Sequence, residues 1–362
     1  PRSLIVIDVA TGRKTSLVKG WLVVDSLAWH PSRNEIWFDG VDPSFRVAIY
    51  AVEGSGRIRM LANGPDLVVV HDISRDGNVL LERETTRNGI LFRREGEAQE
   101  RDLSWLESSE IAGISSDAAW ALFSESQEGG GERGSVYLRR TDGSPALRLG
   151  DGLAQSLSPD GRWALALESF PSRRLVLLPT GVGQPRPLDA GNLNVLGGAF
   201  LPDGRRILVA ANEPGHRPRV YVMDVDGRAP RAFTEEGITD GAAISPDGRS
   251  VALCGPDRVA KIYPVDGGAA RPVSGTETNE VPIQWSADGK SLYLLRRGEL
   301  PARIQRLDLA TGRKQPWREL MPTDRAGLIR VQSVFVTPDG NAYAYTAGRV
   351  LSSDLYLASG LK

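Results

Sequence analysis

Three glutamates at equivalent places in a repeated sequence are the residues best placed for chemistry. Glu84, Glu125 and Glu168 each stand ten residues after the start of a recurring hairpin phrase, in three consecutive repeats. Carboxylates that converge in this way could hold a divalent cation or a basic peptide segment. If the repeats form a ring, Arg296 and Arg297 face them from its other side. The alternative is that all five are solvated charges on surface loops, where such side chains are most often found.

His71 and Asp72 are the other candidate ligand contacts, because they fall on a strand expected to line a central channel. The alternative for His71 is a structural histidine whose hydrogen bonds are satisfied within the fold. The sequence has three histidines, and none is close enough in sequence to another to suggest a metal-chelating pair. No catalytic triad, nucleophile elbow or phosphate-binding loop can be assembled from its motifs. We therefore predict no catalytic residue, no metal site and no cofactor.

A sequence motif of the form apolar–Ser–Pro–Asp–Gly–Arg recurs along the whole chain. The candidate residues stand at fixed distances from its copies, so the structure that the motif forms determines where they lie. Asp-Gly between apolar runs favours a tight turn, since Gly tolerates positive φ and the Asp side chain bonds to nearby backbone. Each copy therefore predicts a β-hairpin, and a period of roughly 40–45 residues is typical of a four-stranded propeller blade. The eight copies begin at residues 30, 74, 115, 158, 201, 245, 286 and 337.

The repeat predicts an all-β chain folded as a single β-propeller domain over residues 1–362. Eight four-stranded blades account for the eight hairpins, and seven is the alternative if the eroded copies at 30 and 115 do not form full blades. Leu4–Asp8 runs into Ala10-Thr11-Gly12-Arg13-Lys14, and Leu307-Asp308 runs into nearly the same words, as a third strand turning into a fourth. We expect residues 1–20 to complete the last blade, so that N- and C-terminal strands pair and close the ring.

Loops of irregular length should lie on the face opposite the Asp-Gly turns, and we expect a ligand on that variable-loop face. They are Asp39–Arg46, Arg83–Gly89, Ser124–Gly134, Ser169–Arg173, Asn212–Pro218 and Arg296–Ala302.

The composition argues against several partner classes. The net charge is −1, so no overall field favours nucleic acid. No apolar run approaches the roughly 20 residues that span a bilayer, so we expect no membrane insertion by this chain. Because the sequence begins at Pro1 within a strand-like phrase, we expect a piece of a longer product, with any targeting or membrane-spanning segment upstream.

The repeated motifs and the closing phrase of the sequence resemble those of a known protein family. The Ser-Pro-Asp-Gly-Arg copies and third strands such as Tyr221-Val222-Met223-Asp224 are similar to the TolB-like propeller repeat, a relative of the WD repeat. The closing phrase Ser353–Lys362 resembles the ends of bacterial proteins in which such a propeller follows a serine/threonine kinase domain or a DNA-binding winged helix. In the kinase-linked group a membrane-spanning helix usually separates the cytoplasmic kinase from the propeller. The resemblance therefore implies a periplasmic or extracellular location and carries over no binding residue.

Our leading hypothesis is a non-enzymatic sensor or interaction propeller that binds a protein or small-molecule ligand on its variable-loop face. The chain has no HRD, DFG or VAIK motif, so a kinase activity would belong to a domain outside it. The alternatives are a lactonase-like or cyclase-like hydrolase with carboxylates at the channel mouth, and the accessory propeller of an oligopeptidase.

Overall fold

The computed structural model describes residues 2–21, 23–42, 46–63, 67–131, 133–169, 172–226, 229–238 and 240–361. It is built almost wholly of antiparallel strands, which confirms the all-β propeller class. The chain divides into two compact units, which are described separately. Unit 1 is Pro1–Thr86 with Val350–Lys362, and unit 2 is Arg87–Arg349. Among the described residues, no helix is long and apolar enough to cross a membrane.

Unit 2 contains five consecutive four-stranded sheets, each with its strands in chain order. Each sheet begins with an inner strand and a hairpin, and a short helix, α1 (Gln127–Gly130), follows β11. The strands are β10 (Ser109–Ile114), β11 (Trp120–Glu125), β12 (Ser135–Arg140), β13 (Leu147–Asp151), β14 (Leu153–Leu157), β15 (Trp163–Leu167), β16 (Leu175–Pro179), β17 (Arg186–Leu188), β18 (Asn194–Phe200), β19 (Arg206–Asn212), β20 (Arg219–Asp224), β21 (Arg231–Ala232), β22 (Asp240–Ile244), β23 (Ser250–Cys254), β24 (Ala260–Pro264), β25 (Arg271–Pro272), β26 (Glu280–Trp285), β27 (Ser291–Arg296), β28 (Ala302–Asp308) and β29 (Lys314–Leu320).

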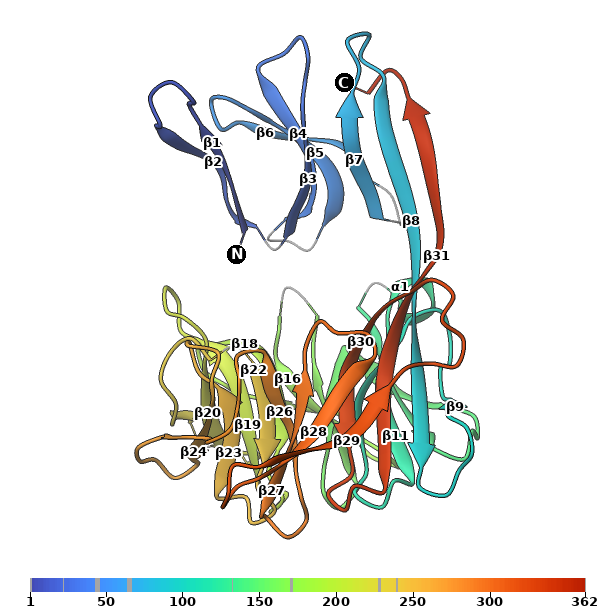
Figure 1. Ribbon diagram of the computed structural model, residues 1–362, viewed down its shortest axis with the longest axis vertical. Helices are drawn as coiled ribbons and strands as arrows, with labels where there is room; N and C mark the ends of the chain where they lie inside the picture. The colour runs from blue at the N-terminus through green and yellow to red at the C-terminus, as the bar shows by residue number, and fades with distance from the viewer. Residues whose placement is uncertain are drawn as a thin grey trace. The chain divides into compact units, whose positions relative to one another are not determined.

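A sixth blade of unit 2 combines strands from both ends of this unit. It follows the order β30 (Leu328–Val336), β31 (Ala342–Ala358), β8 (Val79–Arg94), with β9 (Arg101–Asp102) paired to β8. Figure 1 shows β8 and β31 as long strands, and the boundaries at 86/87 and 349/350 assign part of each to either unit. The Ile111 amide of the first blade donates a buried 3.0 Å hydrogen bond to Thr346 Oγ1 of the sixth. The six blades therefore form a closed ring.

Hydrophobic clusters between neighbouring blades hold this ring together. Six clusters in unit 2 each combine residues from two adjacent blades. The residue just before a hairpin copy is buried in three of these clusters, as Phe200, Trp285 and Val336. The indole N–H of Trp285 also donates to the Ala243 carbonyl at 2.9 Å, which joins two blades through a polar contact.

Unit 1 consists of three sheets. A two-stranded sheet of β1 (Arg2–Ile7) and β2 (Lys14–Trp21) packs on a four-stranded sheet of β3 (Val23–Trp29), β4 (Glu35–Val41), β5 (Val47–Glu53) and β6 (Ile58–Asn63). The other face of that sheet packs on β7 (Leu67–Ile73) and the start of β8, and the end of β31 pairs with β8 in the third sheet.

The structure corrects three expectations about closure. All eight hairpins form, but only six of them lie in the ring, so the single eight-bladed ring is wrong. The copies at 30 and 115 both begin four-stranded sheets, so the reason given for seven blades is also wrong. Residues 1–20 do not complete the last blade, because β1 pairs with β2 and the C-terminal strand β31 pairs with β8 instead. The physical reason is that Arg83–Gly89, expected as a loop, continues the strand β8.

The Asp-Gly turn is stabilised by a recurring hydroxyl–carboxylate pair. The Ser158 hydroxyl donates to Asp160 Oδ1 at 2.6 Å and accepts the Trp163 amide at 2.9 Å, while Gly161 takes a φ of 69°. The same hydroxyl bond lowers the pKa of each aspartate in the series, with further support from backbone N–H groups. The pairs are Ser115–Asp117, Ser158–Asp160, Ser245–Asp247, Ser286–Asp288 and Thr337–Asp339.

These turns predict a loss of stability in acid. A carboxylate whose pKa is lower in the folded chain contributes stability above its ordinary value of 3.8, and that contribution disappears as the pH falls through the folded pKa. We expect the free energy of unfolding, measured with urea, to be insensitive to these groups at neutral pH and to decline below about pH 4. The double variant Asp160→Asn, Asp247→Asn should start lower and decline less steeply. An unchanged pH profile in that variant would contradict the role of the turns.

Candidate functional site

A cavity of about 1470 Å³ lies at the centre of unit 2. All its lining residues belong to that unit, and the inner strands β10, β14, β18, β22, β26 and β30 each contribute to it. One mouth is formed by the Asp-Gly turns, including Pro159, Pro202, Pro246 and Pro338. The other lies where the inner strands begin, beside the loop that joins β27 to β28.

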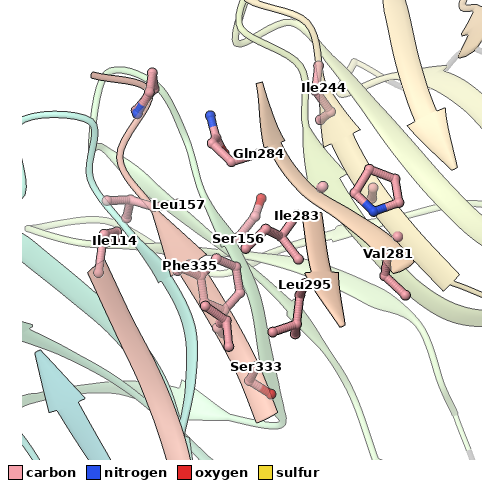
Figure 2. Close-up of a pocket in the computed structure, with 18 of the residues that line it drawn as sticks. Ile114, Ser156, Leu157, Ile244, Val281, Ile283, Gln284, Leu295, Ser333 and Phe335 are labelled. Carbon is pink, nitrogen blue, oxygen red and sulfur yellow. The ribbon is translucent and has the colours of Figure 1, made fainter. Parts of the chain in front are cut away.

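The wall of this channel is mainly apolar. Figure 2 shows Ile114, Leu157, Ile244, Ile283 and Phe335 around the open space, and all five are only partly buried. Their positions depend on β-bulges, since a bulge adds a residue to one strand and redirects the side chains beyond it. Every inner strand of the ring has such an irregularity in its pairing with the second strand. The irregularities fall at Ile111/Gly113, Ala154/Ser156, Val195/Gly197, Asp240/Ala243, Pro282/Gln284 and Gln332/Phe335.

Few polar side chains reach the middle of the channel. Ser156 Oγ accepts the Phe200 amide at 2.9 Å, so its own hydrogen can be directed to a ligand. Gln284 Nε2 donates to the Trp285 carbonyl at 3.1 Å, which leaves its carbonyl oxygen as an acceptor on the wall (Figure 2). Gln155 has a structural role, because its Oε1 accepts the Gly198 amide of the next blade at 3.2 Å. The channel can therefore offer isolated neutral hydrogen bonds on an apolar surface.

Charged groups gather at the loop-side mouth and are joined to partners. Arg296 Nε lies 3.2 Å from Glu299 Oε1, and a second ion pair of 3.4 Å links Arg296 to Glu277. Glu110 accepts a 2.8 Å hydrogen bond from Ser333, which has a positive φ of 50° at the bulge of β30. At this mouth Arg296 is therefore held by ion pairs, whereas Glu110 is held by a serine hydroxyl.

The structure assigns the predicted site residues of unit 2 to different environments. Arg296 and Arg297 line the channel, on the face where we expected a ligand. Glu125 is fully buried and accepts hydrogen bonds from the Leu106 and Ser108 amides at 3.2 and 3.3 Å and from the Ser109 hydroxyl. Glu168 bonds to its own loop, with the Ser172 hydroxyl at 2.6 Å and Arg174 Nε at 3.1 Å. Glu125 therefore satisfies the backbone of its own blade and is not an exposed carboxylate at the channel mouth.

Glu84, His71 and Asp72 belong to unit 1. His71 Nε2 lies 2.7 Å from Glu82 Oε2, and hydrogen bonds from Ser353 and His71 lower the pKa of Glu82. Asp72 is exposed and its Oδ1 accepts the Ile73 amide at 2.8 Å. Over the ranges that the structure describes, no three His, Cys, Asp or Glu side chains form a group that could hold a metal ion.

Several channel residues were missed by sequence reasoning. Gln155, Ile283 and Ser333 lie at or beside the bulges, where simple alternation along a strand fails. Arg330, which also lines the cavity, bonds to Asn88 at 3.3 Å from the start of an inner strand. Their position in the repeat could have identified Gln155, Ile283 and Ser333, because each stands three or four residues before a hairpin copy.

Comparison with known proteins supports the fold. No family model matches the chain. A segment of 146 residues, 39% of the chain, is 29% identical to an uncharacterized protein of Agrobacterium fabrum and spans 49% of it, so the match covers about half the length of that relative.

Solved structures similar to the chain include two TolB proteins. A protein assigned as TolB from Agrobacterium tumefaciens superposes with a TM-score of 0.54 and 20% identity, over 74% of this chain and 99% of that one. TolB from Acinetobacter baumannii covers 81% of this chain and 83% of its own, with a TM-score of 0.47 and 16% identity. At these identities the likeness concerns the fold alone.

Proposed function

We propose that this chain is a non-enzymatic sensor or interaction propeller that binds an extended, mainly apolar ligand in the channel of unit 2. The observation that carries the proposal is the channel itself, about 1470 Å³ with an apolar wall and isolated amide and hydroxyl groups. Burial of apolar surface supplies most of the binding energy in such a site, and a few polar groups fix orientation.

The size of the channel favours a peptide segment over a compact metabolite. Small-molecule pockets are typically about 300–1,000 Å³, and this cavity exceeds that range. Ser156 and Gln284 can bond to peptide N–H and C=O groups, while the ion-paired mouth gives no reason for a highly charged ligand. A protein partner would enter through a strand or loop that reaches into the ring.

The hydrolase alternative depends on carboxylates that converge at the channel mouth. Glu125 is buried and bonded to backbone amides, so it is not available as a free carboxylate at that mouth. No contact among the described residues favours an accessory oligopeptidase role.

The biological setting in this proposal comes from the closing phrase Ser353–Lys362, which resembles the ends of kinase-linked propellers. We propose that the chain is the sensory part of a bacterial serine/threonine kinase and lies on the periplasmic or extracellular side. The complete reading frame tests this directly. A kinase domain followed by one apolar helix upstream of residue 1 is expected, and a frame without them would contradict the setting while leaving the channel proposal intact.

A ligand-stabilisation screen tests the channel. A library of uncharged three- to six-residue peptides is added to the chain, and the melting temperature is measured. At 100 times its Kd a ligand stabilises by about 2.7 kcal/mol, which corresponds to a rise of about 5–10 °C. Ala199→Trp should abolish the rise, since Ala199 lines the cavity and indole would fill it.

Two further variants make the screen decisive. Ser156→Phe is a second blocking change in case Ala199→Trp does not fold, and Val182→Trp, at a fully exposed position, is the matched control. The control should keep the wild-type response. The proposal fails if no peptide stabilises the chain, or if the blocked variants respond as the wild type does.

A further inference from the structure

The sheet of β1 and β2 has an internal twin in unit 2. The Thr11 amide donates to Asp8 Oδ1 at 2.7 Å, and the Thr311 amide donates to Asp308 Oδ1 at 2.8 Å. The strand registers also agree, since Ile7 pairs with Lys14 as Leu307 pairs with Lys314. The strands β1 and β2 are therefore built as the third and fourth strands of a blade, as β28 and β29 are.

The twins differ at one edge. The strand β28 pairs with β29 on one side and β27 on the other, whereas β1 pairs only with β2 among the residues that the structure describes. The Asp8 amide donates to the Arg13 carbonyl at 2.9 Å, so it points toward β2. Because main-chain groups alternate along an antiparallel strand, those of Ile5 and Ile7 point to the other edge. That edge is open to a further strand.

An apolar face lies beside this edge, on the inner strand β3. Leu27 pairs with Phe38 and Trp29 pairs with Ile36, so each pair shares one face of the sheet. Phe38 and Ile36 are buried in the cluster that β1 and β2 complete. Leu27 and Trp29 do not belong to that cluster, and they are 55% and 57% exposed.

The twin blade shows what covers this face elsewhere. Counted from the hairpin copies at 30 and 337, Trp29 corresponds to Val336 and Leu27 to Val334. Both valines are buried, at 3% and 6% exposure, in one cluster with Tyr293 and Leu295 of β27. The counterpart of β27, a second strand with apolar side chains, is therefore missing beside β1 among the residues that the structure describes.

We propose that the open edge of β1 and the exposed side chains of Leu27 and Trp29 form a docking surface for a β-hairpin of the β26–β27 type. Its second strand adds to β1 through main-chain hydrogen bonds at Ile5 and Ile7, which is recognition by strand addition. Its side chains cover Leu27 and Trp29 as Tyr293 and Leu295 cover their counterparts. This surface is independent of the channel.

The test uses a labelled synthetic peptide with the sequence of Glu280–Arg296, the hairpin beside the twin. We expect fluorescence anisotropy to show saturable binding to the 362-residue chain. Leu27→Glu should weaken it at least tenfold, and Ile5→Pro should weaken it by removing an edge N–H. Val9→Glu is the matched control, since Val9 is exposed in the adjoining turn. Amide exchange at Ile5 and Ile7 should slow when the peptide is bound.

Three results would overturn the proposal. One is absence of saturable binding by a peptide shown to be soluble and monomeric. Another is equal binding of a peptide in which serine replaces both Tyr293 and Leu295, because the apolar contact would then be irrelevant. The third is a dimer of the chain that Leu27→Glu dissociates, because the occupant would then be a second copy.

Discussion

Phe92→Ala is expected to lower the free energy of unfolding of unit 2 by about 3–5 kcal/mol. Phe92 lies in the part of β8 that completes the sixth blade, and its side chain is only 1% exposed. It packs in one cluster with Phe123 and Tyr137 of the first blade and Ala344 of β31. Truncation would leave a cavity between the first and last blades, where ring closure depends on strands distant in sequence.

Amide exchange resolved along the chain is the appropriate measurement, because two compact units need not unfold in a single transition. The slowest amides of β10–β30 should exchange about two to three orders of magnitude faster in Phe92→Ala, since 1.4 kcal/mol is a factor of ten. Leu351→Ala, at an exposed position of β31 in unit 1, should leave those amides unchanged. An effect of Phe92→Ala below a factor of ten would contradict the role of β8 in closing the ring.

Lys314→Met is expected to cost about 3 kcal/mol, because it would leave a buried carboxylate without its cation. Lys314 Nζ lies 2.9 Å from Glu280 Oε1, and Glu280 is only 1% exposed. Although burial, the largest single influence, lowers the pKa of Lys314, hydrogen bonds to Glu277 and Glu280 raise it above its ordinary value of 10.5. Because the pKa of Lys314 is raised in the folded chain, its contribution to stability is complete at neutral pH. It is lost only as the pH rises from 10.5 through the pKa in the folded chain.

The internal twin supplies the control for this variant. Lys14 occupies the corresponding place after the Asp8–Thr11 turn but is exposed, so Lys14→Met should change stability by no more than about 0.5 kcal/mol. Urea unfolding of both variants at pH 7 gives the comparison. The double variant Lys314→Met, Glu280→Leu should recover most of the loss, because it removes the uncompensated charge. Equal effects of Lys14→Met and Lys314→Met would contradict this reasoning.

The local hairpins could be predicted from the sequence because each is specified by adjacent residues. Ser158, Asp160 and Gly161 meet within one turn, and the same chemistry recurs at each intact copy. The partner of a blade's third strand is not specified in this way. The second half of β8 pairs with β9 of its own repeat, but it also pairs with β31 from the opposite end of the chain. Nothing local to Thr85–Asn88 distinguishes a loop from a continuous strand.

Some of the candidate residues taken from the sequence lie at the channel, and others do not. Arg296 and Arg297 do line the channel, because their place after an inner hairpin sets them at the loop-side mouth. Glu125 also stands ten residues after the start of a hairpin copy, but its side chain is buried. It accepts hydrogen bonds from the Leu106 and Ser108 amides and from the Ser109 hydroxyl. Equivalent backbone positions therefore need not give equivalent side-chain directions. The bulges had no sequence signal of their own, so Ser156 and Gln284 gained importance only from the structure.

Thiol labelling inside the channel tests the central claim most directly. Cys254 is buried and is the only cysteine, so Ser156→Cys introduces a single reactive thiol on the channel wall. The labelling rate is measured with and without the tightest-binding peptide of the library, with Val182→Cys as the exposed control. We predict at least tenfold slower labelling of Cys at position 156 with the peptide bound and no change at position 182. Equal labelling rates at position 156 with and without saturating peptide would contradict ligand binding in the channel.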